Sequence, residues 1–329
     1  TAPFSPLGHD THISTKNATS FALPTTMPIA PFREQLPENL EDPLHEIYHY
    51  AVISDSEEGM ILVNVDTLAD AEPRNNFFER ALTWNEDGVL NGAQFVELAG
   101  SNAYFATDDE VVIVDLDKPL EPQVHSRVKF NKPRAVAIQF RYIFVTDADG
   151  FHVVDITDVK HPVRIKGASV KLADAHRMYL ARTFAYVAAG KEGLAIIDIE
   201  KVDKPKLYQM FNADGKLNDA YDVKVASTNA SLFAYVADGK NGLKVVQLTD
   251  PERVPTYYGF SPDVKPKLIA WKKTSGRAMS ISKGLDRDRA VDETGHQVSV
   301  LGRIGSRPFY KEEMERLYLN DGKLFTVSD

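Results

Sequence analysis

The chain of 329 residues contains no cysteine. This absence excludes disulfide bonds, thiolate metal sites, cysteine nucleophiles and covalent attachment of c-type haem, which needs a Cys-x-x-Cys-His segment. The chain also lacks any run of about 18 apolar residues, so no transmembrane helix is predicted. Acidic residues outnumber basic ones by 47 to 38, giving a net charge of −9, which disfavours nucleic acid and anionic membrane surfaces as partners.

What the sequence does contain is a short apolar phrase that returns along the chain. Five copies occur, at residues 60–65, 111–116, 151–156, 194–199 and 243–248. The fifth residue of each copy is Asn, Asp or Gln, and these residues lie 51, 40, 43 and 49 positions apart. A period of about 40 to 50 residues, built from short β-branched runs, is typical of a radial β repeat.

Each copy has the same neighbours. Around residues 151–156, an earlier apolar strand at 142–147 ends in a glycine turn, and a proline-containing loop leads to a strand at 162–166. Another short apolar strand, at 135–138, precedes the whole unit. Four strands per period in hairpin-like succession predict an all-β fold, a β-propeller of four-stranded antiparallel blades.

The number of blades is predicted as seven, with six as the alternative. A degenerate sixth unit is expected from Lys267–Trp271 to Gln297–Leu301, and segments 316–319 and 323–327 look like the first two strands of another blade. Open sheet edges are avoided in stable proteins. We therefore expect part of residues 1–35 to form a strand against the last blade, with sequence beyond Asp329 as the alternative source of the missing strands.

Two domains are predicted from composition. Residues 1–44 hold seven of the chain's 18 prolines and are expected to form an N-terminal arm or linker, with one strand near residues 12–15. Residues 45–329 are expected to form the propeller.

The segment Val111-Val-Ile-Val-Asp115 and its other copies resemble the LVIVD-repeat family of β-propellers. The resemblance extends over roughly residues 46–329, and no shared catalytic residues come with it. It implies a prokaryotic module that is extracellular or at the cell surface, with the periplasm as the alternative. It also implies an association with multihaem c-type cytochromes, in which haem is carried by the partner.

We therefore expect a non-catalytic binding or scaffold module for extracellular electron transfer, without membrane insertion or nucleic acid binding. Its expected partner is a multihaem c-type cytochrome or the rest of a larger polypeptide. The alternative is a hydrolase or lyase that uses the central channel. Arg134, Arg177, Asp222 and Lys224 are the charged residues at the starts of inner strands that could serve such chemistry.

One segment, His45-Glu-Ile-Tyr-His49, matches the His-Glu-x-x-His pattern of zinc proteases. A strand is expected to begin at Tyr50, which leaves less than two turns for a helix. On a strand, the two imidazoles would lie about 13 Å apart, too far for one metal ion. We therefore expect ordinary turn histidines here.

Two loops, at residues 85–93 and 212–220, share the pattern Asn-x-Asp-Gly-x-Leu-Asn-x-Ala. Their side-chain oxygens are candidate calcium ligands, because calcium takes oxygen ligands from turns. The candidates are Asn85, Asp87, Asn91, Asn212, Asp214 and Asn218. The alternative is a turn in which Asn binds the backbone and Gly adopts a left-handed conformation.

A further segment, 286–293, alternates Asp and Arg residues. It is expected to form a hairpin in which these opposite charges pair with one another.

Overall fold

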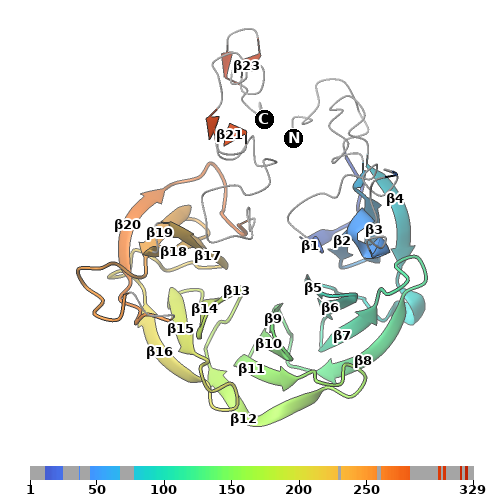
Figure 1. Ribbon diagram of the computed structural model, residues 1–329, viewed down its shortest axis with the longest axis horizontal. Helices are drawn as coiled ribbons and strands as arrows, with labels where there is room; N and C mark the ends of the chain where they lie inside the picture. Colours follow the sequence, from blue (N-terminus) through green and yellow to red (C-terminus); the bar gives the residue numbers. More distant parts are fainter. Residues whose placement is uncertain are drawn as a thin grey trace.

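The structure, a computed structural model, describes residues 12–24, 37, 45–66, 78–228, 231–257 and 261–281, together with four two-residue strands between residues 303 and 324. These residues form five four-stranded antiparallel sheets that are arranged about one axis as propeller blades (Figure 1). The predicted all-β propeller is confirmed. The predicted number of seven blades, with six as the alternative, is wrong, because five blades are found in the described part of the chain.

Each blade uses its strands in chain order, from the axis outward. The first blade consists of β1 (Ala18–Ala22), β2 (Tyr50–Asp55), β3 (Gly59–Asn64) and β4 (Glu79–Trp84). The second consists of β5 (Phe95–Ala99), β6 (Asn102–Ala106), β7 (Glu110–Asp115) and β8 (Gln123–Lys129). The third consists of β9 (Ala135–Gln139), β10 (Tyr142–Asp147), β11 (Gly150–Asp155) and β12 (Val163–Lys171). The fourth consists of β13 (Met178–Ala181), β14 (Phe184–Ala188), β15 (Leu194–Asp198) and β16 (Lys206–Phe211). The fifth consists of β17 (Asp222–Thr228), β18 (Ser231–Ala237), β19 (Leu243–Gln247) and β20 (Lys267–Lys272).

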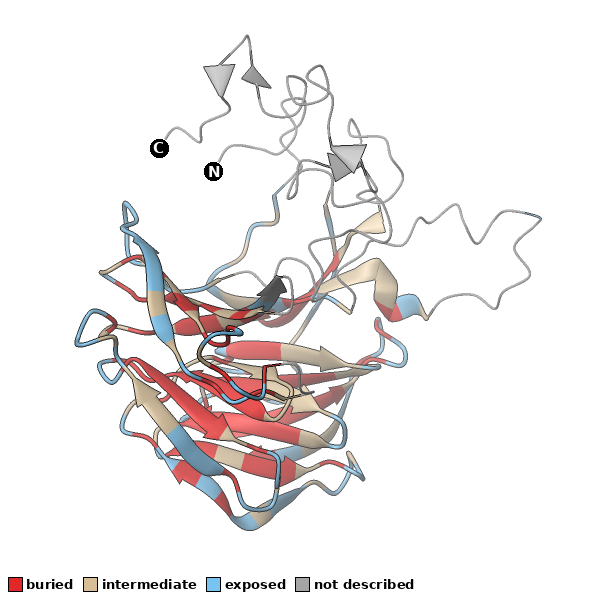
Figure 2. Cartoon of the chain, turned by 60° about the vertical axis from the view of Figure 1, so that its left-hand side comes forward, coloured by how far each residue is buried: buried red, intermediate tan, exposed pale blue. Residues whose placement is uncertain are grey.

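The five apolar phrases form the third strands β3, β7, β11, β15 and β19, as predicted. Val111, Val112, Ile113 and Val114 of β7 are all fully buried, because a third strand lies between two strands of its own sheet and under the neighbouring blades. Figure 2 shows this burial along the middle strands of the blades. The polar fifth residue stabilises the turn that follows the strand. The Asp115 carboxylate accepts a hydrogen bond from the amide of Asp117 at 2.8 Å.

Four hydrophobic clusters fill the spaces between successive blades. Between the first and second blades, for example, Val52 and Met60 pack with Val96 and Phe105. Equivalent clusters join the second blade to the third, the third to the fourth, and the fourth to the fifth. Burial between blades, as well as pairing within them, therefore holds the described ring together.

The N-terminal region supplies a strand, but not where it was predicted. Strand β1 pairs with β2 in the first blade, with Phe21 opposite Ile53 and Ala22 opposite Val52, rather than with the last blade. Residues 12–15, where a strand was expected, precede it without regular structure. The segment assigned to an arm thus contains the innermost strand of blade one.

The segment Lys267–Trp271 belongs to β20, the outer strand of the fifth blade, and does not open a sixth. In blades two to four, the fourth strand begins eight positions after the third ends (115 to 123, 155 to 163, 198 to 206). In the fifth blade this distance is twenty positions (247 to 267), so the sequence suggested a new unit.

Towards the C-terminus the structure describes two short hairpins, β21 (Arg303–Ile304) with β22 (Arg307–Pro308), and β23 (Leu319–Asn320) with β24 (Lys323–Leu324). The second hairpin coincides with part of the two strands expected at 316–319 and 323–327. Segments 286–293 and 297–301 lie outside the described residues.

The strand order gives the propeller two distinct faces. On the entry face, the loops into each inner strand meet the turns between second and third strands. On the opposite face, the turns between first and second strands meet the loops between third and fourth strands.

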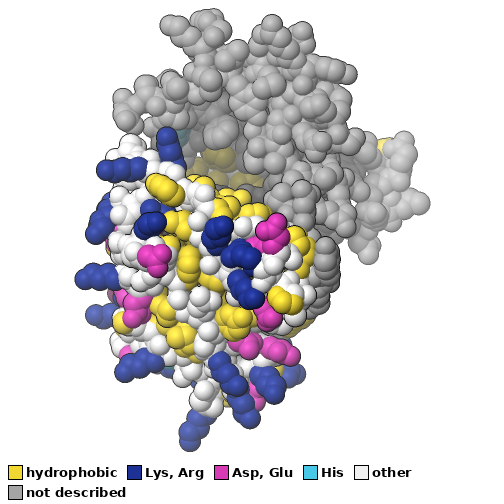
Figure 3. Space-filling model, turned by 90° about the vertical axis from the view of Figure 1, so that its left-hand side faces the viewer, with side chains coloured by type: hydrophobic (Ala, Val, Ile, Leu, Met, Phe, Trp, Pro, Cys, Tyr) yellow, Lys and Arg dark blue, Asp and Glu magenta, His cyan; other side chains and the backbone are white. Residues whose placement is uncertain are grey.

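No helix in the described part of the chain is long and apolar enough to cross a membrane. The side of the ring in Figure 3 carries interspersed basic, acidic and hydrophobic side chains, with no field of one sign.

Candidate functional site

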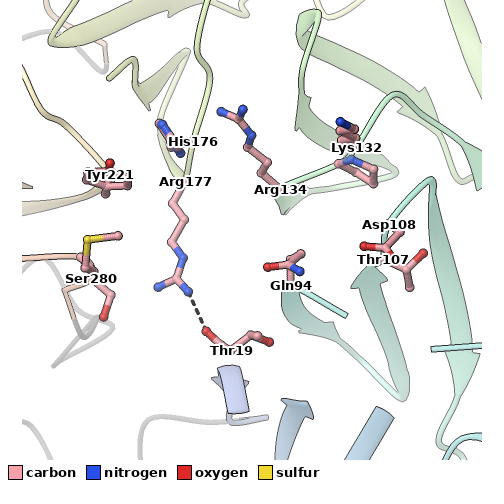
Figure 4. A pocket seen from close by; sticks show the side chains of 12 residues that line it. Thr19, Gln94, Thr107, Asp108, Lys132, Arg134, His176, Arg177, Tyr221 and Ser280 are labelled. Atoms are coloured by element: carbon pink, nitrogen blue, oxygen red, sulfur yellow. Dashed lines mark hydrogen bonds between the residues drawn. The ribbon is translucent and has the colours of Figure 1, made fainter. Parts of the chain in front are cut away.

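A cavity of about 680 Å³ opens on the entry face, at the mouth of the central channel (Figure 4). Its polar lining comes largely from residues at the starts of the inner strands. These residues include Gln94, Lys132, Arg134, His176, Arg177 and Tyr221.

The repeat explains why these side chains converge. The backbone amides of Gln94, Arg134, His176 and Tyr221 each donate to a carbonyl near the end of the second strand of their blade, at 2.7 to 2.9 Å. These four residues therefore occupy equivalent positions in four blades, and each blade places its residue at the same level of the channel mouth.

One charge network joins the third blade to the fourth. The Arg134 guanidinium donates to the Asp174 carboxylate at 2.6 Å and to the carbonyl of Ala175 at 2.9 Å. The other carboxylate oxygen of Asp174 lies 3.1 Å from Nε2 of His176, whose ring packs 4.7 Å from that of Tyr221.

The surroundings shift the pKa of both titratable members of this network. Burial raises the pKa of Asp174, but the hydrogen bond from Arg134 and the charge of His176 outweigh it and hold that pKa below its ordinary value. Burial lowers the pKa of His176, against the opposing effect of Asp174. His176 is therefore neutral at neutral pH.

A second network joins the fourth blade to the fifth and the first. Asp222, only 1% exposed, accepts from Nζ of Lys224 at 2.9 Å and lies 3.6 Å from the Arg177 guanidinium. Arg177 also reaches across the mouth and donates to the carbonyl of Thr19 at 2.8 Å, the dashed line in Figure 4. The backbone amide of Ile281, beyond β20, donates to Asp222 at 3.0 Å.

The four charged residues singled out from the sequence, Arg134, Arg177, Asp222 and Lys224, thus all belong to these networks. The structure adds His176 and Asp174, which sequence reasoning missed. Aligning the repeats would have found His176, because it stands at the position of Arg134 in the next blade. Asp174 lies in the loop before it and carries no signal in the repeat.

The two histidines of the His-Glu-x-x-His segment do not converge. Residues Glu46–His49 form a short 3-10 helix with His45 as its N-cap, and Tyr50 begins β2. His45 lies 3.3 Å from Asp117, whereas His49 lies 2.7 Å from Asp66. Across the described residues, no group of three or more His, Asp or Glu side chains is arranged to hold a metal ion.

The two candidate calcium loops lie on the entry face, before β5 and β17. Their asparagine oxygens already accept hydrogen bonds: Asn85 from the amide of Leu90 at 2.8 Å, Asn91 from the Asn85 side chain, Asn212 from the amide of Gly215, and Asn218 from the Asn241 side chain. Asp87 and Asp214 are exposed and have positive φ angles of 51° and 56°. These hydrogen bonds agree with the alternative interpretation, in which the asparagine side chains stabilise turns. Calcium binding by either loop stays a prediction.

The sequence profile of the LVIVD repeat matches residues 132–166, 174–212 and 219–252, which coincide with the third, fourth and fifth blades. Three of the five blades are therefore LVIVD repeats. The near-literal copy of the phrase at residues 111–115 lies outside the matched ranges, although it forms the same third strand of its blade.

One solved structure shares the fold of this chain at a TM-score above 0.5. A protein from Lactobacillus plantarum is similar to the chain at 11% identity with a TM-score of 0.52, over 80% of this chain and 72% of its own. Hsv2 from Kluyveromyces lactis has 10% identity and a TM-score of 0.42. The match covers 71% of this chain and 61% of the Hsv2 chain. A search of curated proteins found no match. At such identities, the likeness concerns the fold alone.

Proposed function

We propose that this chain is a non-catalytic scaffold that binds a protein partner at the surface of a prokaryotic cell. The observation that supports the proposal is that the charged residues in the channel mouth bind groups of neighbouring blades. Arg134 and Arg177 each link two or more blades, through Asp174, Asp222 and the Thr19 carbonyl. Charges held in this way make the ring rigid, which suits a docking platform.

The lining also lacks the arrangement that covalent catalysis needs. A nucleophile must lie within hydrogen-bond reach of its base. In the described lining, no hydroxyl group is hydrogen-bonded to His176, and the Thr19 hydroxyl instead donates to the carbonyl of Ala93 at 2.8 Å. This supports a binding role over hydrolysis by a serine or threonine.

The proposed partner is a multihaem c-type cytochrome, and the proposed role is in extracellular electron transfer. This part of the proposal rests on the resemblance to LVIVD-repeat propellers. All haem is assigned to the partner, because the chain has no cysteine for covalent attachment.

Size-exclusion chromatography tests the partnership directly. The purified chain is mixed with a purified multihaem c-type cytochrome from the same genome, and haem absorbance is followed across the elution profile. Because the chain has no covalent haem, a shift of haem absorbance to larger size reports a complex. Separate elution of the two proteins would overturn the cytochrome assignment, and a protease digest of intact cells that spares the chain would overturn the surface location.

A channel enzyme is the second candidate, and the pair of His176 and Asp174 favours it. A half-buried histidine that is neutral at neutral pH and oriented by a carboxylate can act as a general base in a hydrolase or lyase. A substrate screen with wild type and His176→Gln tests this. A turnover that the variant loses while keeping its circular dichroism spectrum would favour the enzyme over the scaffold.

A further inference from the structure

On the opposite face of the propeller, one aromatic side chain stands out. Phe140, in the turn between β9 and β10, is 91% exposed, more than any other large hydrophobic side chain in the described part of the chain. An exposed hydrophobic residue of this size gains nothing from the fold. Packing against the described residues therefore does not account for it.

The backbone conformation disfavours phenylalanine as well. Phe140 has a φ of 55°, in the left-handed region that bulky residues rarely adopt. It occupies the first position of a two-residue turn, and the matching position in the second blade is Gly100, with a φ of 58°. Glycine is the residue that such a turn favours. Neither burial nor turn geometry explains Phe140, and a strained residue of this kind points to a function.

Two arginines flank the aromatic ring. Arg141 follows Phe140 directly, and its guanidinium lies over the Tyr142 ring at 5.3 Å and donates to the Tyr142 hydroxyl at 3.0 Å. Arg182 occupies the matching turn of the fourth blade, again with a positive φ of 58°. The Gln139 side chain donates to the carbonyl of Arg182 at 3.0 Å, so the two turns lie side by side.

These cations keep most of their hydrogen-bonding capacity. Within the described residues, the Arg182 guanidinium makes no hydrogen bond or ion pair, and Arg141 bonds to no carboxylate. Asp155 acts on Arg141 through its charge, but its carboxylate accepts hydrogen bonds from the amide and hydroxyl of Thr157. The chain as a whole carries a net charge of −9, yet neither of these guanidinium groups is bonded to a carboxylate within the described residues.

We propose that Phe140, Arg141 and Arg182 form a docking surface for an acidic protein segment. An apolar side chain of the partner covers the Phe140 ring, and its carboxylates pair with the two guanidinium groups. Aromatic and arginine side chains are the types that dominate binding energy at protein interfaces. The inference rests on the proposed binding role and adds the place and the charge of the partner.

Selection of peptides tests the surface without any assumed partner. A random-peptide phage library is panned on the immobilised full chain, and the enriched peptide is resynthesised for fluorescence anisotropy. We expect enriched peptides in which Asp or Glu residues flank one bulky apolar residue, with affinity that falls as salt rises. Phe140→Gly should weaken binding about tenfold, as should Arg141→Gln combined with Arg182→Gly.

The variants are matched to the geometry of the turn. Glycine fits the left-handed positions of Phe140 and Arg182, as Gly100 shows in the second blade. Trp271→Ala, which removes another exposed aromatic ring (65% exposed) on β20, serves as the control and should leave binding unchanged. Failure to enrich acidic peptides, or equal binding to wild type and Phe140→Gly, would overturn the docking surface. Failure of cytochrome binding alone would overturn only the assigned partner.

Discussion

The buried carboxylate of Asp222 allows a quantitative test of the idea that channel charges tie the blades together. In Asp222→Asn the shape is preserved, but Lys224 and Arg177 lose their counter-charge. Breaking a buried ion pair on one side costs about 3–5 kcal/mol. The Lys224 and Arg177 side chains are 19% and 23% exposed, so they regain part of their hydration. We therefore expect a loss of about 2–3 kcal/mol in the free energy of unfolding.

This loss converts into a measurable melting shift. At about 2.1 cal/mol/K per residue, the unfolding entropy of a chain of 329 residues is about 0.7 kcal/mol/K. Asp222→Asn should therefore melt about 3–4 °C below wild type in differential scanning calorimetry. Asp203→Asn, at an exposed loop position, is the charge-matched control and should change stability by less than about 0.5 kcal/mol.

A double-variant cycle separates the pair from other effects of the substitution. Lys224→Met added to Asp222→Asn should cost little further stability, because it removes the cation left unpaired. The reasoning is refuted if Asp222→Asn melts within about 1 °C of wild type. The scaffold proposal would then lose its main support, and the channel charges would be available for chemistry.

Three further predictions concern other parts of the chain. Deleting residues 1–24 removes β1 and exposes the edge of β2, so the melting temperature should fall by several degrees in circular dichroism; an unchanged value would contradict this. The lowered pKa of His176 means that the unfolded chain takes up this proton first as pH falls, so wild-type stability should decline as the pH falls through about 6.5, the ordinary histidine pKa. His176→Gln should flatten that decline in thermal melts. At still lower pH, the stabilisation that comes from the lowered pKa of Asp174 is lost as this carboxylate is protonated. Parallel curves for the two proteins would argue against this origin. The double variant His45→Ala, His49→Ala should keep its metal content in elemental analysis, because the two imidazoles face different carboxylates; stoichiometric zinc lost in the variant would contradict it.

The middle strands of each blade were predictable because burial on both sides leaves a local mark. The phrase at 151–156 is almost continuously apolar, and the structure places β11 at Gly150–Asp155. Its polar fifth residue, Asp155, also behaves as an end signal, because it accepts a hydrogen bond from the amide of Thr157. Here a single stretch of sequence contains all the information that the strand needs.

The number of blades was predicted wrongly because some strands lie far along the chain from the strands they pair with. Strand β1 ends at Ala22, and β2 begins at Tyr50. The long connection before β20 similarly separates this strand from β19. In both cases pairing is decided by the shape of the blade, which no local pattern of apolar residues reports.

The channel mouth shows the same limit for the candidate site. The charged residues at strand starts were identifiable one by one, but their partners were not. Arg177 bonds to Thr19, which lies 158 positions away in the sequence. Such a contact follows from the curvature of the ring, which brings the first and fourth blades to opposite sides of one channel.

The two faces of the propeller therefore differ in how they use their cations. On the entry face, Arg134 and Arg177 are engaged by carboxylates and carbonyls of neighbouring blades, so a ligand there would have to compete with contacts that hold the ring. On the opposite face, Arg182 makes no such contact within the described residues, and Phe140 is exposed to solvent beside it. A partner gains more from groups that the fold leaves unused, because binding then costs no internal interaction. This difference favours the face of Phe140 for protein binding and leaves the channel mouth to keep the blades in register.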